Sequence, residues 1–123
     1  MSGKNSKFKY MYRDASNYKQ FGYVIFCGKP TPKDAEYVIG NLHEGDFFIP
    51  EDVGLQPLQE KFESISIDDH PWHEIDFRRG TDRSPFELTR EFPTGARSVH
   101  EFAEEFAQAK WEEMKASRRM GLI

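Results

Sequence analysis

Acidic, imidazole and indole side chains crowd into residues 68–74, whose sequence is DDHPWHE. Asp69, His70 and Glu74 are of the types that bind metal ions or move protons in active sites. On a helix, His70, His73 and Glu74 would share one face, which is the arrangement that a metal site needs. A metal-assisted hydrolase or nuclease that uses Asp69, His70 and Glu74 is therefore one hypothesis for this chain.

The same segment also has the pattern of a strand, and we prefer that interpretation. Residues 72–78 alternate between polar and apolar side chains, which is typical of a strand with one buried face. In a strand, His73 is a core histidine held by a hydrogen bond, while His70 and Glu74 are spread along the chain, too far apart for one ion. We therefore expect a structural segment without metal or cofactor, and an exposed Trp72 that could contact a partner.

A second polar group follows the first predicted strand and includes Arg13, Asp14 and Tyr18. Loops on rigid scaffolds often hold function, and this mixture of side chains could orient an anionic group. The alternative is an ordinary turn, in which Asp14 bonds to local backbone and Arg13 pairs with a carboxylate. None of these groups forms a series of nucleophile, base and orienting residue, so no covalent mechanism is supported. We therefore expect a binding protein rather than an enzyme.

Residues 19–26 (KQFGYVIF) resemble the aromatic RNA-contacting strand of RNA-recognition and cold-shock domains, in which bases stack on a sheet face. Gln20 departs from that pattern, because those families carry glycine at the matching position. The charge also disagrees: 17 Lys and Arg against 21 Asp and Glu give −4, which argues against a broad nucleic-acid footprint. We expect a buried strand and keep single-stranded nucleic-acid binding as an alternative.

The scaffold predicted for these segments is an α+β domain: a small antiparallel sheet covered by a long C-terminal helix. Thr31 before Pro32 predicts a capped helix, and Ser98 with Glu101 forms the capping-box pattern of another. Aromatic residues, 15% of the chain, supply the core. The predicted elements are a hairpin over residues 8–13 and 21–27, a helix over 32–43, short strands over 47–49 and 72–78, and the long helix over 98–116.

The length of 123 residues predicts one domain. We expect residues 1–7 to be a flexible N-terminus, 8–116 the domain with a long loop at 81–97, and 117–123 a frayed tail. Cys27, the sole cysteine, excludes an internal disulfide and is expected to be a small buried hydrophobe. No apolar run is long enough for a membrane span and no secretory signal is visible, so we expect a cytoplasmic protein.

The opening YMYRDASNYK, at residues 10–19, and the WHE at residues 72–74 are similar to segments of small uncharacterised bacterial proteins. That resemblance implies a bacterial or phage setting and carries no mechanism. Our functional hypothesis is a small binding or regulatory protein that acts by protein–protein contact, for example an inhibitor of the immunity or antitoxin kind. The candidate contact residues are Arg13, Asp14, Tyr18 and Trp72, which include types enriched at binding hot spots.

Overall fold

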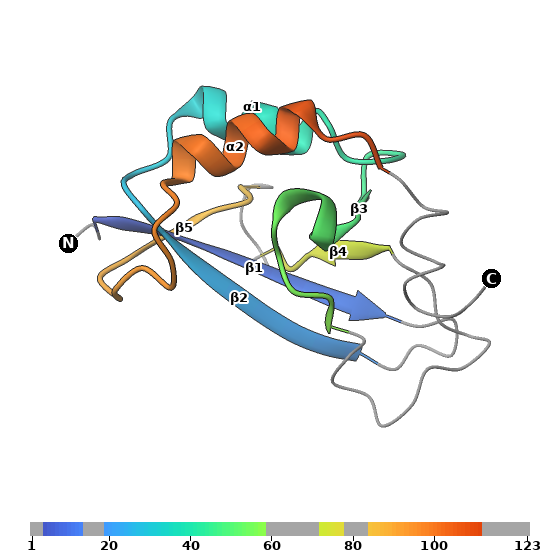
Figure 1. Cartoon of the computed structure of the whole chain (residues 1–123), viewed down its shortest axis with the longest axis horizontal. Coiled ribbons are helices and arrows are strands. Elements are labelled where there is room, and N and C mark those ends of the chain that lie inside the picture. The colour runs from blue at the N-terminus through green and yellow to red at the C-terminus, as the bar shows by residue number, and fades with distance from the viewer. Residues whose placement is uncertain (1–3, 14–18, 59–71, 78–83, 112–123) are drawn as a thin grey trace.

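The computed structural model describes residues 4–13, 19–58, 72–77 and 84–111, and the fold is given for these residues (Figure 1). The strands are β1 (Asn5–Arg13), β2 (Lys19–Cys27), β3 (Phe47–Phe48), β4 (His73–Ile75) and β5 (Glu87–Thr89). The helices are α1 (Pro32–Ile39), the short 3₁₀ helix η1 (Pro50–Val53) and α2 (Val99–Gln108). The predicted α+β class is confirmed.

The sheet is antiparallel throughout and is built around β1. Its order is β2-β1-β4-β3, and β5 pairs with the start of β1 on the edge that β4 uses further along. The β1–β2 hairpin is the longest pairing, running from Asn5 opposite Cys27 to Arg13 opposite Lys19. Side chains alternate between the two faces of a strand, so this register decides which residues share a face.

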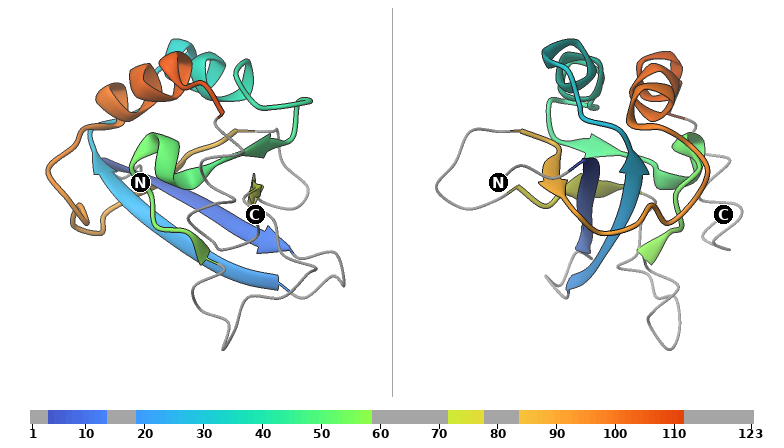
Figure 2. Two further views of the ribbon diagram at one scale, coloured as in Figure 1. Left: turned by 45° about the vertical axis from the view of Figure 1, so that its right-hand side comes forward. Right: turned by 90° about the vertical axis from the view of Figure 1, so that its left-hand side faces the viewer.

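Both α-helices lie side by side on one face of the sheet (Figures 1 and 2). Phe8, Tyr10 and Tyr12 point from β1 into the layer between sheet and helices, and Phe102 and Phe106 meet them from α2. The rings pack closely: the Phe8 and Phe102 ring centroids are 5.0 Å apart. The aromatic core expected from composition is therefore the interior of this two-layer domain.

Each α-helix begins after the N-cap residue that its sequence predicts, and at Thr31, where only an N-cap followed by proline was expected, the structure shows a full capping box. Thr31 and Asp34 exchange side-chain and backbone hydrogen bonds at the start of α1, and Ser98 and Glu101 do the same at α2. These bonds satisfy amide groups that have no partner inside a helix. The helix starts are therefore local features, set by residues three apart in the sequence.

The long C-terminal helix is a prediction that the structure does not confirm, because α2 is only 10 residues long. Ala109 has extended backbone angles, with φ −67° and ψ 139°, and ends the helix. Beyond it, the Trp111 ring packs against Phe48 and Phe106, and its indole N–H donates to the Asn41 carbonyl at 2.9 Å. This contact with the α1–β3 connection takes the chain out of the helical path.

Other boundaries also differ from the predicted ones. The helix expected over residues 32–43 ends at Ile39, and the strand expected over residues 72–78 spans His73–Ile75. The loop expected at residues 81–97 contains strand β5, whose pairing with β1 has no signal in local periodicity. Cys27 is partly rather than fully buried. None of the helices in the described residues has both the length and the apolarity to cross a membrane.

Candidate functional site: the outer face of the sheet

The sheet face turned away from the helices, called the outer face here, carries the odd-numbered residues of β1 and β2. Its side chains are exposed or partly buried along most of the hairpin, whereas the other β1 face is fully buried. In the register, Lys9 lies opposite Tyr23, and Met11 lies opposite Phe21. Phe21 and Tyr23 are 53% and 52% exposed. Large apolar side chains therefore stand half in solvent on this face.

Two lysines of β1 on the outer face are paired with glutamates. Lys7 Nζ lies 3.0 Å from Glu91 Oε2, and Lys9 Nζ lies 3.1 Å from Glu87 Oε1. The hydrogen bond from Lys7 holds the pKa of the Glu91 carboxyl below its usual range, as does that from Thr89. These pairs leave the part of the face around β1 close to electrically neutral.

Arg13 and Glu74 form a third pair, between the end of β1 and β4. The Arg13 Nε and Glu74 Oε2 atoms are 3.6 Å apart. Glu74 lies opposite Met11 in the register of β1 and β4, which brings its side chain beside the hairpin. This contact agrees with the alternative interpretation of Arg13, in which it pairs with a nearby carboxylate.

Residues 90–97 run from β5 toward the free edge of β2 and α2 (Figure 2). The Asn5 side chain donates to the Glu91 carbonyl at 2.9 Å, and the Thr94 amide donates to the Ile25 carbonyl at 2.9 Å. These contacts bury Ile25 and occupy the edge of β2 there. Phe92, between the two anchored residues, is 90% exposed.

A pocket of about 220 Å³ is lined by His43, Glu44, Phe47 and Trp72. Two backbone hydrogen bonds join His43 and Phe47, with N···O distances of 2.7 and 3.0 Å, around a turn in which Glu44 takes the left-handed φ of 52°. The His43 and Trp72 rings stack with centroids 4.4 Å apart and planes at 17°. A tight turn and the start of β4 thus build the pocket together.

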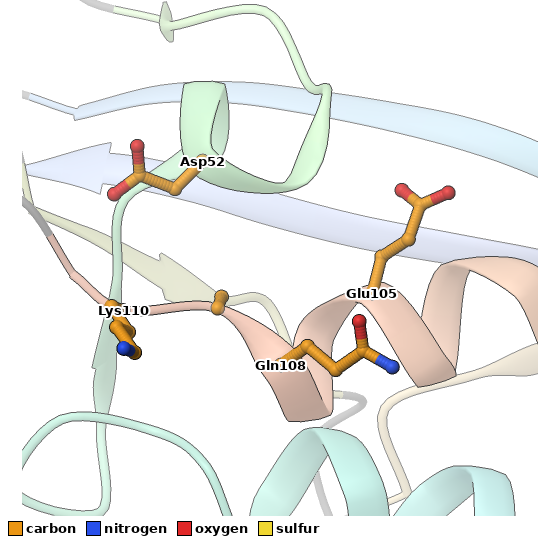
Figure 3. Close-up of a pocket in the computed structure, with 5 residues that line it drawn as sticks. Asp52, Glu105, Gln108 and Lys110 are labelled. Atoms are coloured by element: carbon orange, nitrogen blue, oxygen red, sulfur yellow. The ribbon is translucent and has the colours of Figure 1, made fainter.

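Another hollow, of about 370 Å³, lies between η1 and the end of α2 (Figure 3). It is lined by Asp52, Glu105, Gln108, Ala109 and Lys110. Glu105 forms an ion pair with Arg97, and the carboxylates of Asp52 and Glu105 point in different directions in Figure 3. The two acids therefore do not form the close pair that general acid–base catalysis uses.

Comparison with known proteins finds no matching family model, no matching curated protein and no matching solved structure.

The predicted site residues divide between described and undescribed parts of the chain. Asp14, Tyr18, Asp69 and His70 lie outside the described residues. Trp72 was expected to be exposed, but it is partly buried, because its ring stacks on that of His43, which was not among the predicted site residues. No signal in the sequence pairs these two rings, because they lie on separate elements.

His73 is a core histidine held by a hydrogen bond, which confirms that prediction. It is completely buried, and its Nε2 atom accepts the Leu58 amide N–H at 2.9 Å. A ring nitrogen that accepts such a bond carries no proton, so His73 is neutral here. Glu74 is turned to Arg13, and the described residues contain no group of three side chains able to hold a metal ion.

Phe21 and Tyr23 are the functional candidates that the preferred interpretation of residues 19–26 missed. The expected buried strand holds only for its end, where Ile25 and Phe26 are buried. Toward its start, aromatic residues alternate onto the outer face. The alternation of residues 19–26 indicated that the strand has two different faces. It did not indicate which of these faces the helices would cover.

Proposed function

We propose that this chain is a binding protein that acts by protein–protein contact through the outer face of its sheet. The supporting observation is the half exposure of Phe21 and Tyr23, side by side on β2, on a face that neither α-helix covers. Aromatic rings are enriched at the centres of protein interfaces. Burying the exposed half of each ring would contribute about 2 kcal/mol, from roughly 25 cal/mol per Å² of apolar area.

Charge on this face favours a protein partner over nucleic acid. Phosphate binding draws its free energy from cations that release counterions, and it is strongest where positive charge is in excess. Here Lys7, Lys9 and Arg13 each lie beside a glutamate. A phosphate backbone would meet those carboxylates as well, whereas a protein surface with charges of both signs can match them.

The single-stranded nucleic-acid alternative has one observation in its favour. Lys7 Nζ lies 4.4 Å from the centroid of the Tyr23 ring, so a cation and an exposed ring are adjacent, as on sheet faces where bases stack. Titration with a fluorescent oligonucleotide at low salt tests it. Binding that weakens steeply with salt and is lost in Tyr23→Ala would overturn the protein–protein proposal.

The direct test is affinity capture with purified chain and extract of the source organism, followed by binding of the purified partner. The Phe21→Ala/Tyr23→Ala variant should bind at least tenfold more weakly than the parent. Leu88→Ala is the matched control, because Leu88 on β5 is 48% exposed and its loss removes apolar area elsewhere. Equal binding by the parent and the double variant would contradict the proposal.

The finer hypothesis, an inhibitor of the immunity or antitoxin kind, concerns the identity of the partner. It predicts that the captured protein is a toxic enzyme whose activity falls on stoichiometric addition of this chain. Inhibition should be lost in Phe21→Ala/Tyr23→Ala and kept in Leu88→Ala. A captured partner whose activity is unchanged by the chain would refute this hypothesis and leave the binding proposal intact.

A further inference from the structure

The pocket between His43 and Trp72 has a chemical character of its own. Among the described residues that line it, His43, Phe47 and Trp72 present aromatic rings and Glu44 presents a carboxylate. We propose that this pocket binds an organic cation, a guanidinium or alkylammonium group. The faces of aromatic rings carry negative partial charge and attract such cations, and a neighbouring carboxylate adds to that attraction. The inference does not rest on the proposed function of the outer aromatic residues.

The walls of the pocket are held by backbone structure. His43 and Phe47 face each other across their two mutual hydrogen bonds, and Phe48 pairs with His73, which places Trp72 beside this turn. The stacked His43 and Trp72 rings form one wall, with Phe47 also lining the hollow. A site whose walls are set by strand pairing loses little conformational entropy when a ligand enters.

Charge around the pocket favours a cation over an anion. The lining residues that the structure describes include one carboxylate and neither lysine nor arginine, and the His43 Nε2 atom lies 3.9 Å from the Glu44 Oε1 atom. Glu74 lies opposite Phe47 in the register of β3 and β4 and adds a second carboxylate nearby, although Arg13 pairs with it. Asp46 precedes Phe47 in the turn. An anion placed here would meet these carboxylates and the negative faces of the rings.

The size of the pocket limits the ligand to a small group. Pockets for drug-sized molecules and cofactors typically span about 300–1,000 Å³, and this one is about 220 Å³. It suits the head of a larger molecule, such as a trimethylammonium or guanidinium group. That group could belong to a free metabolite or to a side chain of a protein, and both sources share the same recognition chemistry.

The test uses the whole chain labelled with ¹⁵N and follows the indole N–H signal of Trp72 by NMR. Choline and ethylguanidinium are titrated at constant ionic strength, and 3,3-dimethylbutanol serves as the neutral counterpart of choline. We expect saturable shifts with both cations and binding of the alcohol at least tenfold weaker. Absence of saturable shifts, or equal binding of the alcohol, would overturn the inference.

Variants locate the binding to this pocket. Glu44→Gln should weaken choline binding severalfold without affecting the fold, because Glu44 is largely exposed. Glu36→Gln on α1 is the matched control and should bind as the parent does, and Trp72→Leu should abolish binding. Equal binding by Glu44→Gln and the parent would contradict the assignment even if Trp72→Leu failed to fold.

A peptide arm separates the two sources of the cation. Short peptides that contain arginine or trimethyllysine are compared with choline and ethylguanidinium. Peptide binding more than tenfold tighter than that of the free cations would assign the pocket to a protein side chain, and tighter binding of the free cations would assign it to a small molecule. The Phe21→Ala/Tyr23→Ala variant should bind the peptides and the free cations as the parent does. This result would separate the inference from the proposed function.

Discussion

Asp34 and His100 connect the first turns of the two α-helices, with the Asp34 Oδ2 and His100 Nδ1 atoms 2.7 Å apart. The same Asp34 oxygen accepts the Thr31 amide N–H at 2.8 Å, so one buried carboxylate both caps α1 and holds α2. The helices pack together over the sheet, and this polar contact joins the ends at which their dipoles are positive.

Replacing Asp34 by alanine should therefore destabilise the domain by about 1–3 kcal/mol, because it removes a helix cap and a hydrogen bond to a second helix. Glu36→Ala, two residues beyond Asp34 on α1, is the control and should change stability by less than about 0.5 kcal/mol. Urea unfolding followed by circular dichroism measures both. Equal midpoints for the two variants would contradict the role given to Asp34.

The stability of the parent should fall in acid for the same reason. Burial raises the pKa of Asp34, but hydrogen bonds from Thr31 and His100 outweigh it and hold the pKa below its ordinary value of 3.8. Because the pKa of Asp34 is lower in the folded chain than in the unfolded chain, its ionised carboxylate stabilises the fold. This stabilisation is complete above the pKa of the unfolded chain and is lost as the pH falls through the pKa of the folded chain. The loss therefore begins below about pH 4, and thermal melts of Asp34→Asn should show a shallower decline there.

Tyr10 should ionise only at a pH well above the usual range of a tyrosine. Burial raises its pKa to about 12, and its hydroxyl donates to the Gln56 carbonyl at 2.7 Å. Because the unfolded chain ionises first, this group contributes stability that is complete below about pH 10 and declines as the pH rises toward 12. Tyr10→Phe should reduce the phenolate absorbance change near pH 12. It should also cost about 1 kcal/mol at neutral pH.

Gly22 should tolerate alanine poorly. A Cβ atom at this position would lie 2.6 Å from Leu58 Cδ2, a buried side chain that packs on the hairpin. Overpacking of this kind typically costs about 1–3 kcal/mol. Gly95→Ala is the control, because nothing lies within 4 Å of its added Cβ. Chemical denaturation should separate the two variants, and equal stability would show that Leu58 moves aside without cost.

His73 should be replaced better by a hydrogen-bond acceptor than by an apolar residue of similar size. His73→Leu leaves the buried Leu58 amide without the ring nitrogen that accepts its bond, which costs about 1–3 kcal/mol. His73→Gln offers an amide oxygen in its place and should retain part of that free energy. A higher unfolding midpoint for His73→Leu than for His73→Gln would show that packing outweighs the hydrogen bond at this position.

Much of the scaffold was predictable because its signals are local. The alternation of Phe8, Tyr10 and Tyr12 predicted a half-buried strand. The N-cap Thr31 before Pro32 and the capping box at Ser98 predicted both helix starts. His73 was placed in the core by the same period of two. In each case the residues that interact, or that set the pattern, are close neighbours in the chain.

The ends of elements and the contents of the site depended on contacts distant in sequence. The end of α2 follows the docking of Trp111 on Asn41, and β5 exists through its pairing with β1. Neither contact leaves a periodic trace in its own segment. Propensity is a weak constraint that tertiary packing overrides, and this is why the predicted long helix is wrong.

By itself, the sequence determined the class of the fold, the hairpin, the helix starts and the burial of His73, since backbone geometry and local hydrogen bonds dictate them. Only the tertiary structure decided that Phe21 and Tyr23 stand in solvent, because alternation defines two faces and the helices choose which one to cover. It also brought Trp72 onto His43, through strand pairings that join segments far apart in the chain.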